Sequence, residues 1–348
     1  MSDTAQKSPS PRASPRAAAG DAPPTVLEAD PDVYGEDGDS AFGLGDHGSE
    51  TTSLASSIYR FREENGRTYN AYKEGAYFLP NDESENSRLD LQHNLCILMQ
   101  DNRLFISPAG KDKPLGRVLD AGCGTGIWAI DFADEHPEAA VVGVDLSPIQ
   151  PPFIPPNLQF LIDDLEAEWT YSIPFDFIYM RLLCGSIKDW PNLFRQSFQN
   201  LNPGGYIEVC DPLNPLICDD GTLPADCALV KWNSLFVEAS IKLGASLISV
   251  RDYEKQLVEA GFTNVEKVEF KWPINSWPKD KKYKELGSWV YENILEGLQA
   301  LSLMLFTNVL GWTPEELEVF LVDVRKDLKN RSIHAYWPFY IVYGQKPE

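Results

Sequence analysis

Short apolar runs alternate with amphipathic segments over residues 115–211. The apolar runs predict five strands, in the segments GRVLDAG, AAVVGVDLS, LQFLIDDLE, FDFIYMRLL and YIEVCDP. IWAIDFADEH and WPNLFRQSFQN have the spacing of helices, and the turn Pro203-Gly204-Gly205 is expected to end the second one. Because strands that are apolar throughout are buried on both faces, the pattern predicts an α/β fold with a parallel sheet covered by helices on both sides.

The periodicity changes after Pro212, where helical spacing predominates. We expect helices in PADCALVKWNSLFVEASIKLG, in DYEKQLVEAGF and over about residues 281–330, where Thr313 caps the last one. NVEKVEFKWPI and IHAYWPFYIVYGQK predict two more strands. On the N-terminal side, LPNDESEN predicts the start of a helix, with Asp82 or Ser84 as its cap.

These patterns divide the chain into four parts. Residues 1–52 are poor in large apolar side chains and are predicted to be a disordered tail, because they cannot bury enough surface to offset chain entropy. Residues 53–114 are rich in aromatic residues and are expected to form a helical leader that acts as a lid. Residues 115–211 form the core, and residues 212–348 combine a helical insert that caps the substrate with the closing strands of the sheet.

The chain is strongly acidic. It has 52 Asp and Glu against 30 Lys and Arg, a net charge of −22, so we expect no direct binding to nucleic acid or to an anionic membrane. Its six cysteines show no C-x-x-C pair and no zinc-ligand spacing, which predicts free thiols in a reducing compartment and no metal site. With no signal peptide and no run of about 20 apolar residues, a soluble intracellular protein is expected.

The turn after the first predicted strand carries three glycines. Gly122, Gly124 and Gly126 have the spacing G-x-G-x-G, whereas a dinucleotide fingerprint requires glycine where this chain has Ile127. Asp120 precedes the turn at the strand end, where parallel sheets bind ligands. A carboxylate there disfavours a pyrophosphate and favours a cation. S-adenosylmethionine carries an ammonium and a sulfonium, and its amino group suits Asp120.

Two further acids follow the next two strands. Asp145 ends the second apolar run and can accept both hydroxyls of a ribose, a group that S-adenosylmethionine and NAD share. Asp163 or Asp164 ends the third run. We expect Asp164 to accept from the exocyclic amine of adenine and the backbone N–H of Leu165 to pair with the ring. Acids at three consecutive strand ends, together with the glycine turn, predict that residues 115–211 bind S-adenosylmethionine.

Several segments resemble class I S-adenosylmethionine-dependent methyltransferases: VLDAGCGTGIWAIDFA, VVGVDLSPIQP, FDFIYMRLL and DWPNLFRQSFQNLNPGGYIEV. The leader ENGRTYNAYKEGAYFLPNDESENSRLDLQHN and the ending YIVYGQKP are similar to the fungal LaeA-like branch of that family, and the resemblance spans about residues 57–346. It implies a Rossmann-like sheet of seven mainly parallel strands, the last one antiparallel, with the cofactor held by the turn and strand-end residues named above. It also implies that Tyr69, Arg67 and Arg181 lie near the cofactor.

The catalytic chemistry is less well defined by the sequence. Methyl transfer needs a base only when the pKa of the acceptor atom is high, and His93, His334, Glu208 and Asp211 are the candidates for one. We expect the substrate pocket between the leader and the insert. The insert is rich in large aromatic residues: Trp232, Phe236, Trp272, Trp277, Trp289, Phe306 and Trp312.

Two functions fit these observations. The first is an enzyme of the cytoplasm that methylates an oxygen, nitrogen or carboxylate of a fungal secondary metabolite. The second is a LaeA-like regulator of secondary metabolism, in the nucleus, that acts through protein partners. The glycine turn and all three strand-end acids are present, which favours the enzyme, and the acidic tail is compatible with either function.

Overall fold

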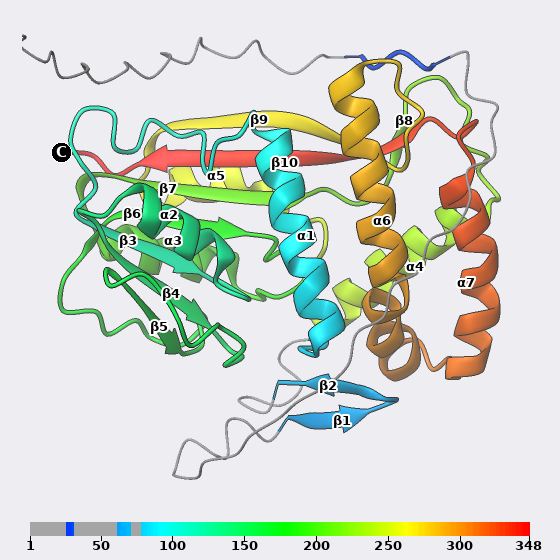
Figure 1. Ribbon diagram of the computed structural model, residues 1–348, viewed down its shortest axis with the longest axis horizontal. Coiled ribbons are helices and arrows are strands. Elements are labelled where there is room, and N and C mark those ends of the chain that lie inside the picture. Colours follow the sequence, from blue (N-terminus) through cyan, green and yellow to red (C-terminus); the bar gives the residue numbers. More distant parts are fainter. Residues whose placement is uncertain (1–25, 31–60, 71–77) are drawn as a thin grey trace, which may run out of the picture.

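A computed structural model describes residues 26–30, 61–70 and 78–348 of the chain (Figure 1). Within these residues an eight-stranded sheet forms the centre of the molecule. Its strands run in the order β5-β4-β3-β6-β7-β10-β8, and β9 pairs with β10. The helices pack on both faces of this sheet and around one of its ends.

The five strands predicted within residues 115–211 are all present, and each is parallel to its neighbours in this part of the sheet. They are β3 (Arg117–Ala121), β4 (Ala140–Asp145), β5 (Leu158–Ile162), β6 (Phe175–Arg181) and β7 (Leu201–Pro212). The carboxyl ends of β3, β4, β5 and β6 therefore lie at one edge of the sheet. Acidic residues from three of these strands and their loops meet there.

Alternate side chains of β6 belong to two separate cores, one on each face of the sheet. Phe177 and Tyr179 pack on the face covered by α1 (Glu83–Met99) and α2 (Ile127–Glu135), whereas Ile178 and Met180 pack on the other. That second face is covered by α3 (Trp190–Gln199), the short η2 (Ser249–Asp252) and α5 (Tyr253–Ala260). The prediction of a sheet buried on both faces is confirmed.

The remaining strands complete the sheet in antiparallel fashion. β10 (Ala335–Gln345) pairs antiparallel with β7 on one side and with β9 (Thr263–Pro273) on the other. Seven strands, β3 to β7 with β9 and β10, thus form the mainly parallel sheet that the family resemblance implied. The two-residue β8 (Ile217–Cys218), which the sequence did not predict, pairs with the start of β10.

The insert is helical, as predicted. It contains α4 (Ala228–Leu243), α6 (Lys281–Met304), the π-helical turn η3 (Leu305–Val309) and α7 (Pro314–Lys329). Thr313 caps α7 in a capping box with Glu316. Figure 1 shows α4, α6 and α7 grouped beyond one end of the sheet, and α1 from the leader packs against α6. A helix of the leader and the insert therefore adjoin each other.

The leader differs in part from the helices that were expected. α1 is present and Asp82 caps it, accepting from the backbone N–H of Glu85. The segment before it instead forms a hairpin of β1 (Arg62–Glu64) and β2 (Arg67–Tyr69). Its turn is Asn65-Gly66, with φ of 52° and 75°, and Asn-Gly is a strong signal for a two-residue hairpin turn.

Two other predictions need correction. In the tail predicted to be disordered, residues 26–30 lie against the start of α6: Leu27 is buried, and the backbone N–H of Asp30 donates to the carbonyl of Trp277. The rest of that tail lies outside the described residues. Pro203-Gly204-Gly205 is not the end of α3, which stops at Gln199, but an irregularity within β7, where the pairing with β6 shifts register.

Candidate active site

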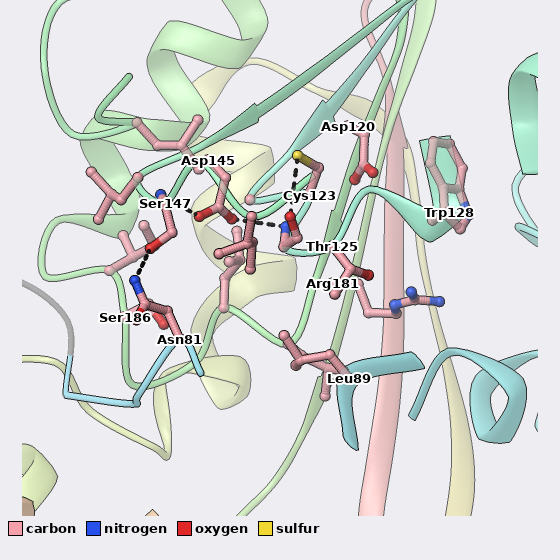
Figure 2. A pocket seen from close by; sticks show the side chains of 18 of the residues that line it. Asn81, Leu89, Asp120, Cys123, Thr125, Trp128, Asp145, Ser147, Arg181 and Ser186 are labelled. Atoms are coloured by element: carbon pink, nitrogen blue, oxygen red, sulfur yellow. Dashed lines mark hydrogen bonds between the residues drawn. The ribbon is translucent and has the colours of Figure 1, made fainter. Parts of the chain in front are cut away.

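A cavity of about 150 Å³ opens at the carboxyl ends of β3 to β6, and we call it the strand-end cavity (Figure 2). The glycine turn, the loops after β4 and β5, and the end of β6 form its walls. Eight of the ten predicted cofactor residues lie at this edge of the sheet, and seven of them line the cavity: Asp120, Gly122, Gly124, Asp145, Asp164, Leu165 and Arg181.

The glycine turn connects β3 to α2 in a conformation that favours glycine. Gly122, Gly124 and Gly126 have φ of 78°, 55° and 81°. Gly126, the eighth residue, does not line the cavity: a Cβ there would lie 2.3 Å from Cζ of Phe160. Gly126 therefore lets α2 begin close against β5, whereas the other two glycines bring backbone to the cavity wall.

Asp120 has a buried carboxylate oxygen that no hydrogen bond from the described residues satisfies. Its side chain is 3% exposed, and its Oδ2 has no hydrogen-bond partner in the described part of the chain. Burial raises the pKa of Asp120 to about 7, although the nearby Arg181 acts in the opposite direction. A buried carboxylate oxygen without a partner is costly, so a bound cation that donates to Oδ2 would be stabilised.

Asp145 is held in place at the end of β4. Its Oδ2 accepts from the backbone N–H of Gly124 at 2.8 Å, and its Oδ1 accepts from that of Ser147 at 2.9 Å. These bonds lower the pKa of Asp145, but burial has the larger effect and raises it. Each carboxylate oxygen can accept a second bond. Asp145 can therefore accept from two hydroxyls while it stabilises the turn.

The loop after β5 brings Asp163, Asp164 and Leu165 to the cavity. Asp164 Oδ1 accepts from the backbone N–H of Glu166 at 2.9 Å, and Asp163 Oδ1 accepts from the backbone N–H of Asp164 at 2.8 Å. The backbone N–H of Asp163 donates to the carbonyl of Asp145, which ties this loop to β4. Both acids line the cavity, so the geometry does not separate the two alternatives that the sequence raised.

Arg181, the last residue of β6, is oriented by His93 of α1, which in turn contacts Asp131 of α2. Its Nη2 lies 3.1 Å from Nδ1 of His93, and His93 Nε2 lies 2.9 Å from Oδ2 of Asp131. A guanidinium can only donate, so Nδ1 of His93 accepts and the proton is on Nε2. Burial, followed by the charge of Arg181, lowers the pKa of His93 to about 3. His93 is therefore a neutral residue that orients Arg181, and it does not line the cavity.

Arg67 and Tyr69, which the resemblance placed near the cofactor, do not line the strand-end cavity. Arg67 forms an ion pair with Asp82, with Nη2 2.9 Å from Oδ1. Tyr69 is buried beneath the guanidinium of Arg62, 5.4 Å from the ring centroid. The hairpin reaches the cavity indirectly, since the carbonyl of Thr68 accepts from the backbone N–H of Asn81, which does line it.

The other candidate bases lie elsewhere. Glu208 is fully buried in β7 and accepts from the backbone N–H groups of Ile106 and Ser107 at 3.0 and 2.6 Å. Asp211 accepts from the backbone of Cys184 and from the hydroxyl of Tyr253. Burial raises the pKa of Glu208 to about 7 and that of Asp211 to about 6, but neither lines the cavity.

His334 is the fourth candidate, and it also lies away from the strand-end cavity. It is at the start of β10, where its Nδ1 lies 2.5 Å from Oδ2 of Asp220. Its backbone N–H donates to the hydroxyl of Thr222. These contacts join the loop after β8 to β10, which gives His334 a structural role at that end of the sheet.

A second cavity, of about 120 Å³, adjoins the first, and we call it the aromatic cavity. Its walls come from α1, α4, α6 and the ends of β7, β9 and β10. Of the seven aromatic residues proposed for the substrate pocket, Trp232, Phe236 and Trp272 line it, and Phe78 and Trp337 join them. Leu89, Gln92 and Leu182 line both cavities, so the two spaces meet at these residues.

The other four aromatic residues proposed for the pocket serve elsewhere. Trp277 is buried and donates to the carbonyl of Ala335. Phe306 packs edge-on against Trp312, with ring centroids 5.3 Å apart, in the core between η3 and α7. Trp289 is 45% exposed on α6.

Several residues that the sequence analysis did not single out also line the strand-end cavity: Asn81, Leu89, Gln92, Thr125, Trp128 and Ser147. Leu89 and Gln92 carried a signal, because a spacing of three places them on one face of the predicted helix. The other four belong to loops or to the first turn of α2, where no periodicity marks an inward direction. Within the described residues, no group of three or more His, Cys, Asp or Glu side chains could hold a metal ion.

Comparison with known proteins identifies relatives that match most of the chain. The family model for a methyltransferase domain matches residues 91–267. Methyltransferase pytC of Aspergillus terreus is 42% identical over 327 residues, covering 93% of this chain and 97% of that protein. Protein-methionine methyltransferase laeA of Emericella nidulans is 38% identical over 292 residues, covering 83% and 77%.

A solved structure of phosphoethanolamine N-methyltransferase 2 from Haemonchus contortus, in complex with S-adenosylmethionine, is also similar. It is 17% identical with a TM-score of 0.43, and the match covers 74% of this chain and 53% of that one.

Among the described helices, none is both long and apolar enough to cross a membrane.

Proposed function

We propose that this chain, which belongs to the methyltransferase family and is an S-adenosylmethionine-dependent methyltransferase, acts on a small apolar molecule. In this proposal the acceptor binds in the aromatic cavity. The observation that carries this proposal is the junction of the two cavities at Leu89, Gln92 and Leu182. A cofactor in the strand-end cavity and an acceptor in the aromatic cavity would meet there. Methyl transfer requires such a contact, because the acceptor atom must approach the methyl carbon in line with the bond to sulfur.

The strand-end residues suit the parts of the cofactor. Asp120 Oδ2, buried and without a partner in the described chain, would accept from the ammonium group, and Arg181 would face the carboxylate of the same methionine part. Asp145 would accept from the ribose hydroxyls, and Asp164 with the backbone of Leu165 would bind the adenine. These roles follow from the charge and position of each group. Gly122 and Gly124 would let the backbone of the turn approach the cofactor closely.

The chemistry divides between cofactor and protein. S-adenosylmethionine, when bound, would supply an electrophilic methyl carbon on a positively charged sulfur, with neutral S-adenosylhomocysteine as the leaving group. The proton of a hydroxyl or N–H acceptor would be released to bulk solvent. The residues of this chain bind and orient the two reactants and exclude water from the junction. We assign no general base, because His93, Glu208, Asp211 and His334 all have other partners and lie outside both cavities.

The cofactor assignment is tested by Asp120→Asn, with the affinity for S-adenosylhomocysteine as the measurement. Loss of a charge-assisted bond to the ammonium should weaken binding about thirtyfold to hundredfold. Asp176→Asn is the control, since that acid lies outside the cavity and accepts from the backbone of Gly116 at the other end of β3. An unchanged affinity in Asp120→Asn would disprove the role of Asp120.

A second candidate function is that of a regulator that acts through protein partners. Its support is the similarity to laeA proteins, which are named secondary metabolism regulators. Deletion of the gene followed by metabolite profiling separates the two functions: an enzyme for one small molecule predicts the loss of one methylated product, and a regulator predicts the loss of many unrelated products. We expect the small-molecule enzyme in the cytoplasm and the regulator in the nucleus, which a fluorescent fusion would distinguish.

A further inference from the structure

We propose that Gln92 binds a polar group of the acceptor next to the atom that receives the methyl group. Its side chain would thereby select aromatic acceptors that carry a hydroxyl or N–H at the end facing the cofactor. This inference rests on the proposed function and adds a specificity-determining residue to it. It starts from the position of Gln92, one of three residues that line both the strand-end cavity and the aromatic cavity.

Gln92 is the polar residue at this junction. The other two residues that line both cavities, Leu89 and Leu182, are apolar. Gln92 is 8% exposed, and its side-chain amide has no hydrogen-bond partner among the described residues. Neither amide atom is fully enclosed by protein, so the accessible part of the side chain faces the cavities that it lines. A buried amide that offers both a donor and an acceptor is stabilised when a ligand satisfies it.

The polar residues elsewhere in the aromatic cavity already have protein partners. Arg88 donates to Glu85 through two nitrogens, at 2.9 and 2.6 Å, and to Asn293 at 2.9 Å. Asn214 Oδ1 accepts from the side chains of Asn233 and Trp337, at 2.7 and 3.1 Å. The charge of Arg88 is compensated by a buried carboxylate, so the cavity does not favour an anionic acceptor.

The position of Gln92 is held by contacts on both sides of it along α1. Two residues before it, Asp90 Oδ1 accepts from the hydroxyl of Thr125 in the glycine turn at 2.7 Å. One residue after it, His93 contacts Asp131 of α2 and Arg181 of β6. These contacts attach this part of α1 to the cofactor-binding elements. The elements that form the strand-end cavity therefore also fix the position of Gln92 on α1.

The walls beyond Gln92 indicate the rest of the acceptor. Trp232 and Phe236 are stacked, with ring centroids 5.2 Å apart, and Phe78 meets Phe236 edge-on at 6.4 Å. Trp272 and Trp337 add two more aromatic surfaces. Such walls favour flat, apolar ring systems. The amide of Gln92 then requires a hydrogen-bonding group at the end of the ring system nearest the cofactor.

The test compares two ligands of similar shape that differ in one polar group, 2-naphthol and 2-methylnaphthalene. Their binding to the full-length protein saturated with S-adenosylhomocysteine is measured by quenching of tryptophan fluorescence. Gln92→Met keeps the length of the side chain and removes its polar atoms. We expect it to weaken 2-naphthol roughly fivefold to tenfold and to leave 2-methylnaphthalene within about twofold.

Three controls make the result specific. Gln92→Glu keeps an acceptor for the hydroxyl and should retain more of the preference for 2-naphthol than Gln92→Met. Asn94→Ala, on the exposed side of α1, should bind both ligands as the wild type does. The affinity of each variant for S-adenosylhomocysteine shows whether the strand-end cavity is intact.

Each outcome bears on a separate claim. If Gln92→Met weakens both ligands equally, or neither, Gln92 does not recognise the polar group and the inference is wrong, whereas the acceptor cavity stands. If neither ligand binds the wild-type protein, both the acceptor cavity and the role of Gln92 are overturned. Loss of S-adenosylhomocysteine binding in the wild type would instead contradict the cofactor assignment.

Discussion

The two cavities of this protein are built in different ways. The strand-end cavity is lined by the glycine turn and by the ends and following loops of consecutive β-strands, all within residues 120–187 apart from four residues of the leader. Its lining combines acidic side chains with aliphatic ones. The aromatic cavity is lined largely by apolar side chains from the leader, the strand ends and the insert, which are up to 259 residues apart in the sequence, from Phe78 to Trp337. Local structure therefore determines the first cavity, and long-range packing determines the second.

This difference explains how substitutions should act. In the strand-end cavity a change alters backbone conformation or an unpaired charge, so its effects on stability and on cofactor binding are large. In the aromatic cavity one side chain contributes part of an extended apolar wall, so a conservative change should act mainly on the acceptor. The following predictions test this contrast, from the largest expected effect to the smallest.

The largest effect is expected for Gly126→Ala. A Cβ at Gly126 would lie 2.3 Å from Phe160, and the residue has a left-handed φ of 81°. Backbone strain and overpacking together should lower the free energy of unfolding by about 2–5 kcal/mol, measured by urea denaturation. Gly221→Ala is the matched control, because Gly221 has a similar φ of 76° with nothing within 4 Å of its Cβ. Equal losses in both variants would show that contact with Phe160 is unimportant.

Asp120 should make the stability of the ligand-free protein depend on pH. Its pKa is raised from 3.8 to about 7 in the folded state. Because the folded state holds the proton of Asp120 more tightly than the unfolded state, its contribution to stability is greatest below pH 3.8. This contribution is lost as the pH rises from there through about 7, by at most about 4 kcal/mol. Glu208 and Asp211, with pKa values of about 7 and about 6, act in the same window.

Asp120→Asn isolates the contribution of Asp120 to this pH dependence of stability. The variant should unfold at a higher temperature than the wild type at pH 8 and at a similar temperature near pH 4. Saturating S-adenosylhomocysteine should narrow this difference at pH 8 by about 2–3 kcal/mol, because the ligand binds the wild type about thirtyfold to hundredfold more tightly. A variant that is less stable than the wild type at pH 8 without ligand would contradict the raised pKa.

Phe236→Leu should separate the aromatic cavity from the strand-end cavity. Loss of the stacking on Trp232 is expected to lower the free energy of unfolding by about 1 kcal/mol and the affinity for 2-naphthol about fivefold. The affinity for S-adenosylhomocysteine should stay within about twofold of the wild type. Trp289→Leu, at an exposed position on α6, is the control and should change neither affinity. Weakening of both ligands by Phe236→Leu would show that the cavities are not separable.

Of the two substitutions that act on S-adenosylhomocysteine, Asp120→Asn and His93→Ala, the second should have the smaller effect. Without His93, the guanidinium of Arg181 loses the acceptor that orients it. We expect about fivefold weaker binding of S-adenosylhomocysteine, worth about 1 kcal/mol. 5′-Methylthioadenosine lacks the amino-acid part of that ligand, so its affinity should hardly change. His93→Asn, which keeps an acceptor oxygen near the position of Nδ1, should lie closer to the wild type. Equal losses for the two ligands would indicate a general structural effect.

The predicted elements of residues 115–211 agree with the fold because their sequence signals are local. Apolar strands, amphipathic helices and a glycine turn each depend on neighbouring residues. Errors arose where a contact from elsewhere competed. Pro203-Gly204-Gly205 has the composition of a turn, yet the residues on either side of it pair with β6. Gly204 and Gly205 also exchange backbone hydrogen bonds with Lys346, just after β10, so the segment becomes part of β7. Leu27 belongs to a polar tail, yet it is buried in the core, and its neighbours Glu28 and Asp30 bond to the backbone of the segment just before α6.

The candidate site shows the same division. The sequence by itself determined the nature of the strand-end residues, because a parallel sheet brings Asp120, Asp145 and Asp164 to one edge whatever surrounds it. Only the tertiary structure decided that His93 orients Arg181 and that Glu208 holds a distant loop, since both depend on partners remote in the sequence. It also placed Gln92 between the two cavities, because the packing of α1 against α2 and α6 sets which face of that helix meets the site.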